Sequence, residues 1–164
     1  MRISRATMIV AAPIEAVFDM FVDATLLATW FPRARGLTDL SGKLDEAGTT
    51  YTLLFAGPAR ASCEVTEVER PVQHERTFVL SFGIFDHVLR SVRGCVKMHF
   101  RAEGPGTNVT LDCEYVPPAG LGGRLVGVMI ERQVADEMKR FKDTVERAAP
   151  NDDVLSNDGE PARA

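Results

Sequence analysis

The stretch VRGCVKMHFRAEGPGTNVTLDCEY, residues 92–115, decides the fold class of this chain. Apolar and polar residues alternate on both sides of the turn at residues 104–106. Because successive side chains of a strand point to opposite faces, the two runs predict an antiparallel hairpin with one apolar face and one polar face. The apolar face carries Val92, Val96, Met98, Phe100, Val109, Leu111, Cys113 and Tyr115. Such a face needs a covering layer.

The same alternation continues toward the N-terminus and predicts a curved antiparallel sheet of seven strands. Turn signals such as Ser41-Gly42 and Gly57-Pro58 separate the runs. Strands are expected over residues 2–11, 33–40, 49–57, 60–69, 75–85, 88–102 and 107–116. Their mostly short connections favour a meander.

Two short helices are predicted between the first two strands. The segment IEAVFDMFVD, residues 14–23, follows Pro13 and has its apolar residues at helical spacing. The segment ATLLATW, residues 24–30, follows Asp23 as a capping residue and ends before Pro32. Trp30 is large and apolar, so we expect it to be buried.

The covering layer is a long helix over about residues 121–147. Its apolar stripe carries Ile130, Val134, Met138, Phe141 and Val145. Gly123 and Gly127 fall on the same stripe, which suggests either room for a cavity or a close helix–strand contact. Leu125, Val128 and Met129 extend the apolar surface beyond one face. They predict a loop contact, a subunit interface or a ligand entrance.

The amino-acid composition indicates which kinds of binding partner are disfavoured. The chain has 164 residues and a formal net charge of -4, which disfavours nucleic acid and an anionic membrane surface as partners. No apolar run resembles a signal-peptide core or a membrane span, so a cytoplasmic protein is expected.

Cys63, Cys95 and Cys113 form no CxxC pair and are expected to be reduced thiols. His74, His87 and His99 lack metal-site spacing, and no nucleotide or other cofactor motif is present.

The expected domain covers residues 1–148. The remaining residues, 149–164, are poor in apolar side chains and are predicted to form a disordered tail. A monomer or a homodimer would be compatible with this single domain.

The order of elements resembles the START-like superfamily, also called SRPBCC, and in particular its bacterial polyketide cyclase/dehydrase-like branch. The superfamily includes the birch-pollen allergen group and lipid-transfer START domains. The resemblance rests on IVAAPIEAVFDMFVD at 9–23, TWFP at 29–32, GTTY at 48–51, EVTEVERP at 64–71, GTNVTLDCEY at 106–115 and MKRFKDTVE at 138–146. It implies an α+β helix-grip fold with an interior cavity between the sheet and the long helix. It implies no single activity.

Side-chain parity on the strands, with the helix stripe, selects the candidate ligand-binding residues. They are Tyr51, Leu53, Phe55, Cys63, Phe78, Leu80, Phe82, Val96, Met98, Gly127 and Ile130. Two polar residues are candidates for catalysis. Arg90 shares parity with Val92 and could polarise a carbonyl oxygen, or it could simply reach solvent from a strand end. Tyr51 could present its hydroxyl to a ligand or serve in the core.

Other catalytic constellations are weak. Glu64, Glu67, Glu69, Asp112 and Glu114 have the parity of the solvent face, so no inward-facing pair of acids is expected. Neither a nucleophile elbow nor a phosphate-binding glycine loop is present.

Three hypotheses of function follow. The first is a carrier or sensor for a hydrophobic molecule such as a lipid, a quinone or a polyketide-like aromatic. The second is a cyclase or aromatase that folds a substrate in the same cavity, where orientation supplies much of the rate. The third is an interaction module that acts through the apolar start of the long helix.

Overall fold

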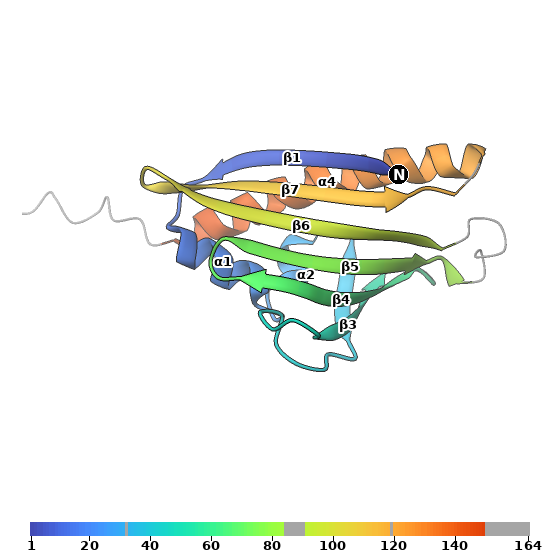
Figure 1. The fold of residues 1–164 in the computed structure, drawn as a ribbon, viewed down its shortest axis with the longest axis horizontal. Coiled ribbons are helices and arrows are strands. Elements are labelled where there is room, and N and C mark those ends of the chain that lie inside the picture. Colours follow the sequence, from blue (N-terminus) through green and yellow to red (C-terminus); the bar gives the residue numbers. More distant parts are fainter. Residues whose placement is uncertain (32, 84–90, 119, 150–164) are drawn as a thin grey trace, which may run out of the picture.

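The computed structural model describes residues 1–31, 33–83, 91–118 and 120–149, and it contains one seven-stranded antiparallel sheet (Figure 1). The strand order is β1-β7-β6-β5-β4-β3-β2. The strands are β1 (Arg2–Val10), β2 (Ala34–Thr38), β3 (Thr50–Phe55), β4 (Arg60–Glu69), β5 (Gln73–Ser81), β6 (Val92–Glu103) and β7 (Gly106–Val116). The expected seven-stranded sheet is confirmed.

One connection departs from a simple meander. β1 pairs with β7 rather than with β2, so the first two strands lie at opposite edges of the sheet. The chain crosses from one edge to the other through the helices α1 (Ile14–Val22) and α2 (Leu27–Trp30). Sequence alternation alone cannot reveal this crossing, because it reports the faces of a strand and not its neighbours.

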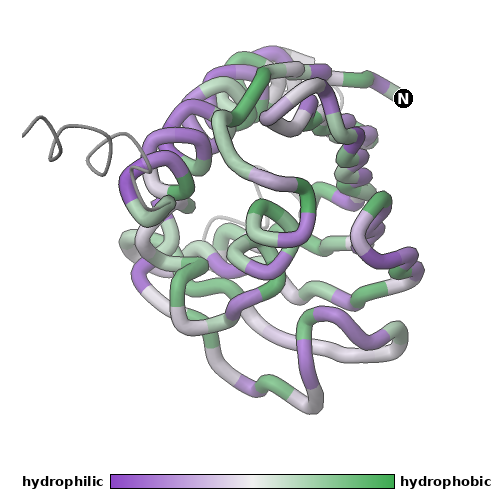
Figure 2. The backbone as a smooth tube through the Cα atoms, turned by 90° about the vertical axis from the view of Figure 1, so that its left-hand side faces the viewer, coloured by the Kyte–Doolittle hydropathy of each residue, from purple (hydrophilic) through white to green (hydrophobic). Residues whose placement is uncertain are grey.

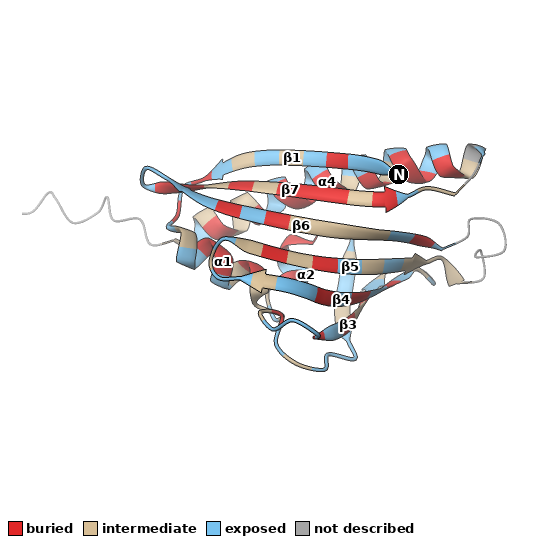
Figure 3. Ribbon diagram, in the orientation of Figure 1, coloured by how far each residue is buried: buried red, intermediate tan, exposed pale blue. Residues whose placement is uncertain are grey.

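The alternation itself is preserved in three dimensions. Along the strands, buried and exposed residues alternate in Figure 3, and hydrophilic and hydrophobic segments alternate along the backbone in Figure 2. Facing residues in the β6–β7 pair, such as Met98 with Leu111 and Phe100 with Val109, both point inward and are buried. One face of the sheet is therefore apolar and concave, and the other is solvated.

The long helix α4 (Leu121–Ala148) covers part of the concave face (Figure 1). It lies mainly against β1 and also contacts β7, α1 and α2. The predicted stripe is confirmed, since Ile130, Val134, Met138, Phe141 and Val145 are all buried. Ala149 donates its backbone N–H to the Val145 carbonyl at 2.9 Å and ends the helix. The predicted tail lies otherwise outside the described residues.

The short helices lie within their predicted segments, but α2 begins at Leu27 rather than at residue 24, because residues 24–26 form a turn. On α1, Val17, Phe18 and Phe21 face the interior and are buried. Asp23 does not cap α2, because its carboxylate accepts the backbone N–H of Thr25 at 2.8 Å in the turn between the helices. Pro32, the predicted stop, is outside the described residues.

Aromatic side chains fill the end of the interior next to α1. Phe21 lies at the centre of this aromatic cluster, with ring centroids 5.5 Å from Trp30, 5.6 Å from Phe100 and 5.9 Å from Phe141. Trp30 is 1% exposed, as predicted. Aromatic pairs at these separations add to the apolar burial of each ring. This end of the molecule is therefore solidly packed.

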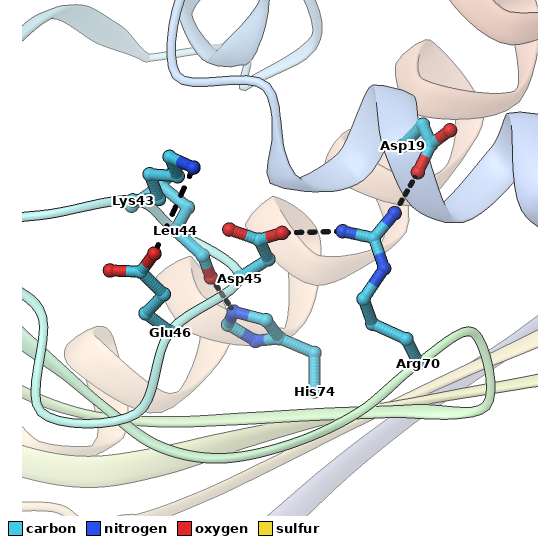
Figure 4. A network of polar contacts seen from close by, with 7 residues as sticks. All are labelled: Asp19, Lys43, Leu44, Asp45, Glu46, Arg70 and His74. Atoms are coloured by element: carbon cyan, nitrogen blue, oxygen red, sulfur yellow. Dashed lines mark hydrogen bonds and ion pairs between the residues drawn. The ribbon is translucent and has the colours of Figure 1, made fainter.

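The loop between β2 and β3 is held against the same end by polar contacts (Figure 4). Arg70 makes ion pairs with Asp19 of α1 and Asp45 of the loop. The His74 ring donates from Nε2 to the Leu44 carbonyl at 2.9 Å. Burial and the nearby Arg76 charge lower the pKa of His74 to about 4, so the ring is neutral at physiological pH. No helix in the described part of the chain is long and apolar enough to cross a membrane.

We expect Trp30→Ala to lower the free energy of unfolding by about 3–5 kcal/mol, because it empties a buried ring-sized space in the aromatic cluster. Urea denaturation followed by circular dichroism measures the change. Leu125→Ala is the control, because Leu125 is 71% exposed and its truncation should change stability by less than about 0.5 kcal/mol. Equal unfolding midpoints for Trp30→Ala and the wild-type chain would contradict the packing described above.

Candidate functional site

A cavity of about 520 Å³ lies between the concave face of the sheet and α4, beyond the aromatic cluster. Its apolar walls come from the inward faces of β3 to β7 and from α4. The lining side chains predicted from the sequence are Leu53, Phe55, Cys63, Phe78, Leu80, Phe82, Val96 and Ile130. Their contact with a ligand remains a prediction.

Other predicted site residues do not line the cavity. Met98 of β6 is buried in the core, and Tyr51 of β3 is buried with its hydroxyl accepting a hydrogen bond from Arg76. Gly127 is absent from the lining, because a Cβ at this position would meet Nη1 of Arg2 and the hydroxyl of Tyr115. The glycine therefore marks a packing contact. Arg90 lies outside the described residues.

Some residues of the cavity wall are only partly buried, whereas others, such as Leu53 and Cys63, are buried. On β6, Val92 and Met98 are buried, whereas Val96 on the same inward face is only half-buried. On β5, Phe78 and Leu80 also face inward and are half-buried. These side chains pack against the core and also line the cavity, so part of their apolar surface faces the cavity.

The start of α4 divides its apolar residues between the cavity and the surface. Met129 lines the cavity, whereas Leu125 and Val128 are exposed. Gln133, one turn after Met129, adds an amide to the lining.

A buried polar group closes the inner end of the cavity. Arg76 of β5 donates from Nη2 to Glu137 Oε1 at 3.4 Å and from Nη1 to the Tyr51 hydroxyl at 3.2 Å. Arg76 is 4% exposed and Glu137 5% exposed, and both line the cavity. The guanidinium also lies 5.7 Å from the Phe21 ring centroid, where the aromatic cluster begins.

Arg76 keeps hydrogen-bond donors that no acceptor in the described part of the chain uses. A guanidinium carries five N–H donors, and the two hydrogen bonds that Arg76 makes are both long. A ligand oxygen at this end of the cavity could accept one of the remaining donors.

Burial controls protonation at this inner end. It raises the pKa of Glu137 to about 7, against the attraction of Arg76, which lowers it. Burial also raises the pKa of the Tyr51 hydroxyl and of the Cys63 thiol, and it raises that of the Cys113 thiol to about 12. The two thiols and the phenol are therefore protonated at neutral pH, which makes the thiols poor nucleophiles.

Strand parity predicted no inward-facing pair of acids, and it did not reveal Glu137, a single acid that lines the cavity. Glu137 lies on α4, three residues after Val134 and within the apolar stripe, where strand parity does not apply. Arg76 was also missed, although it shares strand parity with Phe78 and Leu80. The sequence did contain an indication of this pair, because Arg76 and Glu137 are charged residues at positions that face the interior from a strand and from a helix. Their pairing depends on how α4 crosses the sheet.

The rim of the cavity is formed by its exposed lining residues. These are Arg33, Arg35 and Ala56, from the start of β2 and the end of β3. The cavity therefore runs from a basic rim, past apolar walls, to a buried polar inner end.

Together, the curved sheet, the long covering helix and the cavity between them define a helix-grip protein. The chain belongs to the family described as polyketide cyclase / dehydrase and lipid transport, whose model matches residues 1–150. The resemblance stated from sequence is thereby confirmed. No curated protein matches the chain in sequence.

Solved structures share this fold at low sequence identity. A protein from Mesorhizobium loti has a TM-score of 0.74 and 14% identity, with 91% of this chain and 100% of that chain covered. DynU16, from the dynemicin biosynthetic locus, has a TM-score of 0.67 and 18% identity, with 90% and 48% covered. Ara h 8.0201 has a TM-score of 0.65 and 12% identity, with 88% and 97% covered. These likenesses establish the helix-grip architecture.

Gly123→Ala and Gly127→Ala are expected to differ in stability. A Cβ at Gly123 would lie 1.8 Å from the Pro118 carbonyl oxygen, so backbone must move and we expect a loss of about 1–3 kcal/mol. At Gly127 the nearest atom, at 2.5 Å, ends the flexible Arg2 side chain. Gly127→Ala should therefore be neutral or gain up to about 1 kcal/mol of helix propensity. Chemical denaturation tests this order, and a more damaging Gly127→Ala would contradict it.

The pKa of Glu137 predicts a pH dependence of stability. Because the folded value of about 7 exceeds the ordinary value of 4.5, the folded state holds the proton more tightly. The stability that this proton contributes is present below pH 4.5 and is lost as pH rises through 7. The free energy of unfolding of the wild-type chain, minus that of Glu137→Gln, should fall over this interval by on the order of 3 kcal/mol.

Urea denaturation of both proteins between pH 4.5 and 8 measures this difference. Glu131→Gln, on the exposed face of the same helix, is the matched control and should show a constant offset. A difference between the wild-type chain and Glu137→Gln that stays constant or grows with pH would contradict the assignment.

Proposed function

We propose that this protein binds a hydrophobic small molecule in the cavity and acts as its carrier or sensor. The observation that carries the proposal is the row of inward-facing apolar side chains that stay half-buried, including Phe78, Leu80 and Val96. Apolar surface left open inside a domain gains free energy when a ligand covers it, by roughly 25 cal/mol per Å². Membership of a family whose description includes lipid transport supports the same function.

The size and polarity of the cavity narrow the ligand. A volume of about 520 Å³ lies within the range of roughly 300–1,000 Å³ typical of pockets for drug-sized molecules. One acyl chain or a few fused rings would suit it. The unused donors of Arg76 favour a ligand whose buried end carries a carbonyl or hydroxyl oxygen.

A second candidate is a cyclase-type enzyme, which the polar inner end favours. The Arg76 guanidinium could polarise a ligand carbonyl. Glu137, with a pKa of about 7, could exchange a proton with the adjacent carbon or oxygen at neutral pH. Tyr51, selected from sequence as a catalytic candidate, would then orient Arg76 through its hydrogen bond.

Native mass spectrometry of the freshly purified protein distinguishes the two candidates. A carrier should release an added poly-β-carbonyl compound with unchanged mass. An enzyme of the cyclase type should convert it with loss of water, and Arg76→Gln and Glu137→Gln should stop that conversion.

Filling the cavity should abolish binding of an apolar probe. Leu80→Trp places a large ring into the space, and we expect it to weaken the binding of Nile red at least about 10-fold, since the probe and the ring exclude each other. Val79→Trp is the matched control, because Val79 is the preceding residue on β5 and points to the solvated face. Fluorescence titration measures both affinities. Equal Nile red binding by the two variants, with both folded by circular dichroism, would refute the proposed site.

A further inference from the structure

The rim of the cavity carries two arginines that no described residue neutralises. Arg33 and Arg35 are two positions apart at the start of β2, are exposed, and line the cavity. Within residues 1–31, 33–83, 91–118 and 120–149, neither side chain has an acidic partner, a hydrogen bond or a ring contact. By contrast, Arg5, Arg70, Arg76 and Arg101 each form an ion pair.

The lining of the cavity is basic although the chain is acidic. Among the residues that the structure describes, the charged residues of the lining are Arg33, Arg35 and Arg76 against Glu137, three positive minus one negative, which gives +2 when Glu137 is ionised. The whole chain has a formal net charge of -4. Both charges in excess lie at the rim, because Arg76 and Glu137 offset each other at the inner end. The electrostatic field at the opening therefore favours an anion.

Desolvation decides which end an anionic group would occupy. At the inner end, an anion would lose its water and would lie beside the Glu137 carboxylate, which repels it. At the rim, the anion stays hydrated and meets two guanidinium groups, each able to form a bidentate contact with a carboxylate or phosphate. An anionic group at the rim also leaves the apolar body of the ligand against the half-buried walls.

We propose that the ligand is an anionic amphiphile, a single-chain or few-ring molecule whose carboxylate or phosphate is bound by Arg33 and Arg35 at the rim. Its apolar body enters the cavity, and any oxygen at its far end meets Arg76. This inference rests on the proposed function, since it assigns the class and the orientation of the molecule bound in the same cavity.

Two fluorescent probes that differ only in charge test the proposal. They are 11-(dansylamino)undecanoic acid and its methyl ester, each titrated against the full chain. The wild-type protein should bind the acid more tightly than the ester. The double substitution R33Q/R35Q should weaken binding of the acid by about 5- to 20-fold and that of the ester by less than about 2-fold, as expected for two exposed charge contacts. Displacement by dodecanoate and by dodecyl phosphate then shows which anionic group is preferred.

The control is the double substitution R132Q/R140Q. It removes the same charge from exposed positions of α4 that do not line the cavity, and it should leave both affinities within about 2-fold of the wild type. In 1 M salt the ratio of acid to ester affinity should fall for the wild-type protein, because rim charges are screened over about 3 Å.

The outcomes separate the inference from the proposed function. If both probes bind equally and R33Q/R35Q changes neither affinity, the anionic rim is refuted while binding in the cavity stands. If neither probe binds, both proposals fail. If R33Q/R35Q instead abolishes sedimentation with phosphatidylglycerol vesicles and leaves acid binding unchanged, the arginines contact a membrane and the ligand assignment is overturned.

Discussion

The concave face of the sheet is apolar over a wider area than one helix can cover, and the rest of the structure depends on this mismatch. A sheet with a continuous apolar face must bury it, and α4 lies mainly against β1 at one edge. At the end of the sheet next to α1, aromatic side chains from α1, α2 and α4 cover the apolar surface that the backbone of α4 does not reach. At the other end nothing from the described chain fills it, and the cavity remains. The packed core and the cavity thus share one interior, and Phe21 and Arg76 lie at the boundary between them.

Arg76 and Glu137, the ion pair at the inner end of the cavity, are costly to bury. Their position therefore calls for a physical reason. Ions removed from water lose several kcal/mol of hydration each, and a long ion pair recovers only part of that. The raised pKa of Glu137 expresses the same cost, since a proton removes the charge. An apolar pair of similar size would pack at least as well. Under the proposed function, contact with the ligand gives a physical reason for keeping Arg76 and Glu137 at the wall of the cavity.

The two ends of the cavity differ in how they treat charge. Arg33 and Arg35 are hydrated and cost little to maintain, so they can attract an anion without stabilising the fold. Arg76 and Glu137 are buried away from water, so a neutral hydrogen-bonding group can contact them at a lower desolvation cost than an ion. Under the proposal of an anionic amphiphile, this difference between the two ends gives the ligand one favoured direction of entry. The fold itself leaves the choice between carrying and converting that ligand to the chemistry of a few side chains.

Local patterns in the sequence determined the strands, the covering helix and most of the apolar cavity wall. Strand parity and helical spacing are properties of a single element, so residues such as Phe78, Leu80 and Ile130 could be assigned to the interior from the sequence. Only the tertiary structure decided the pairing of β1 with β7, the contact of Gly127 with Arg2, and the meeting of Arg76 with Glu137. Each of these depends on how elements distant in sequence cross in space. The helical position of Gly127 specified its face, but not whether a cavity or a neighbouring side chain lay opposite. The physical reason is that alternation fixes the direction of a side chain relative to its own backbone, whereas the curvature of the sheet and the path of α4 determine what that side chain meets.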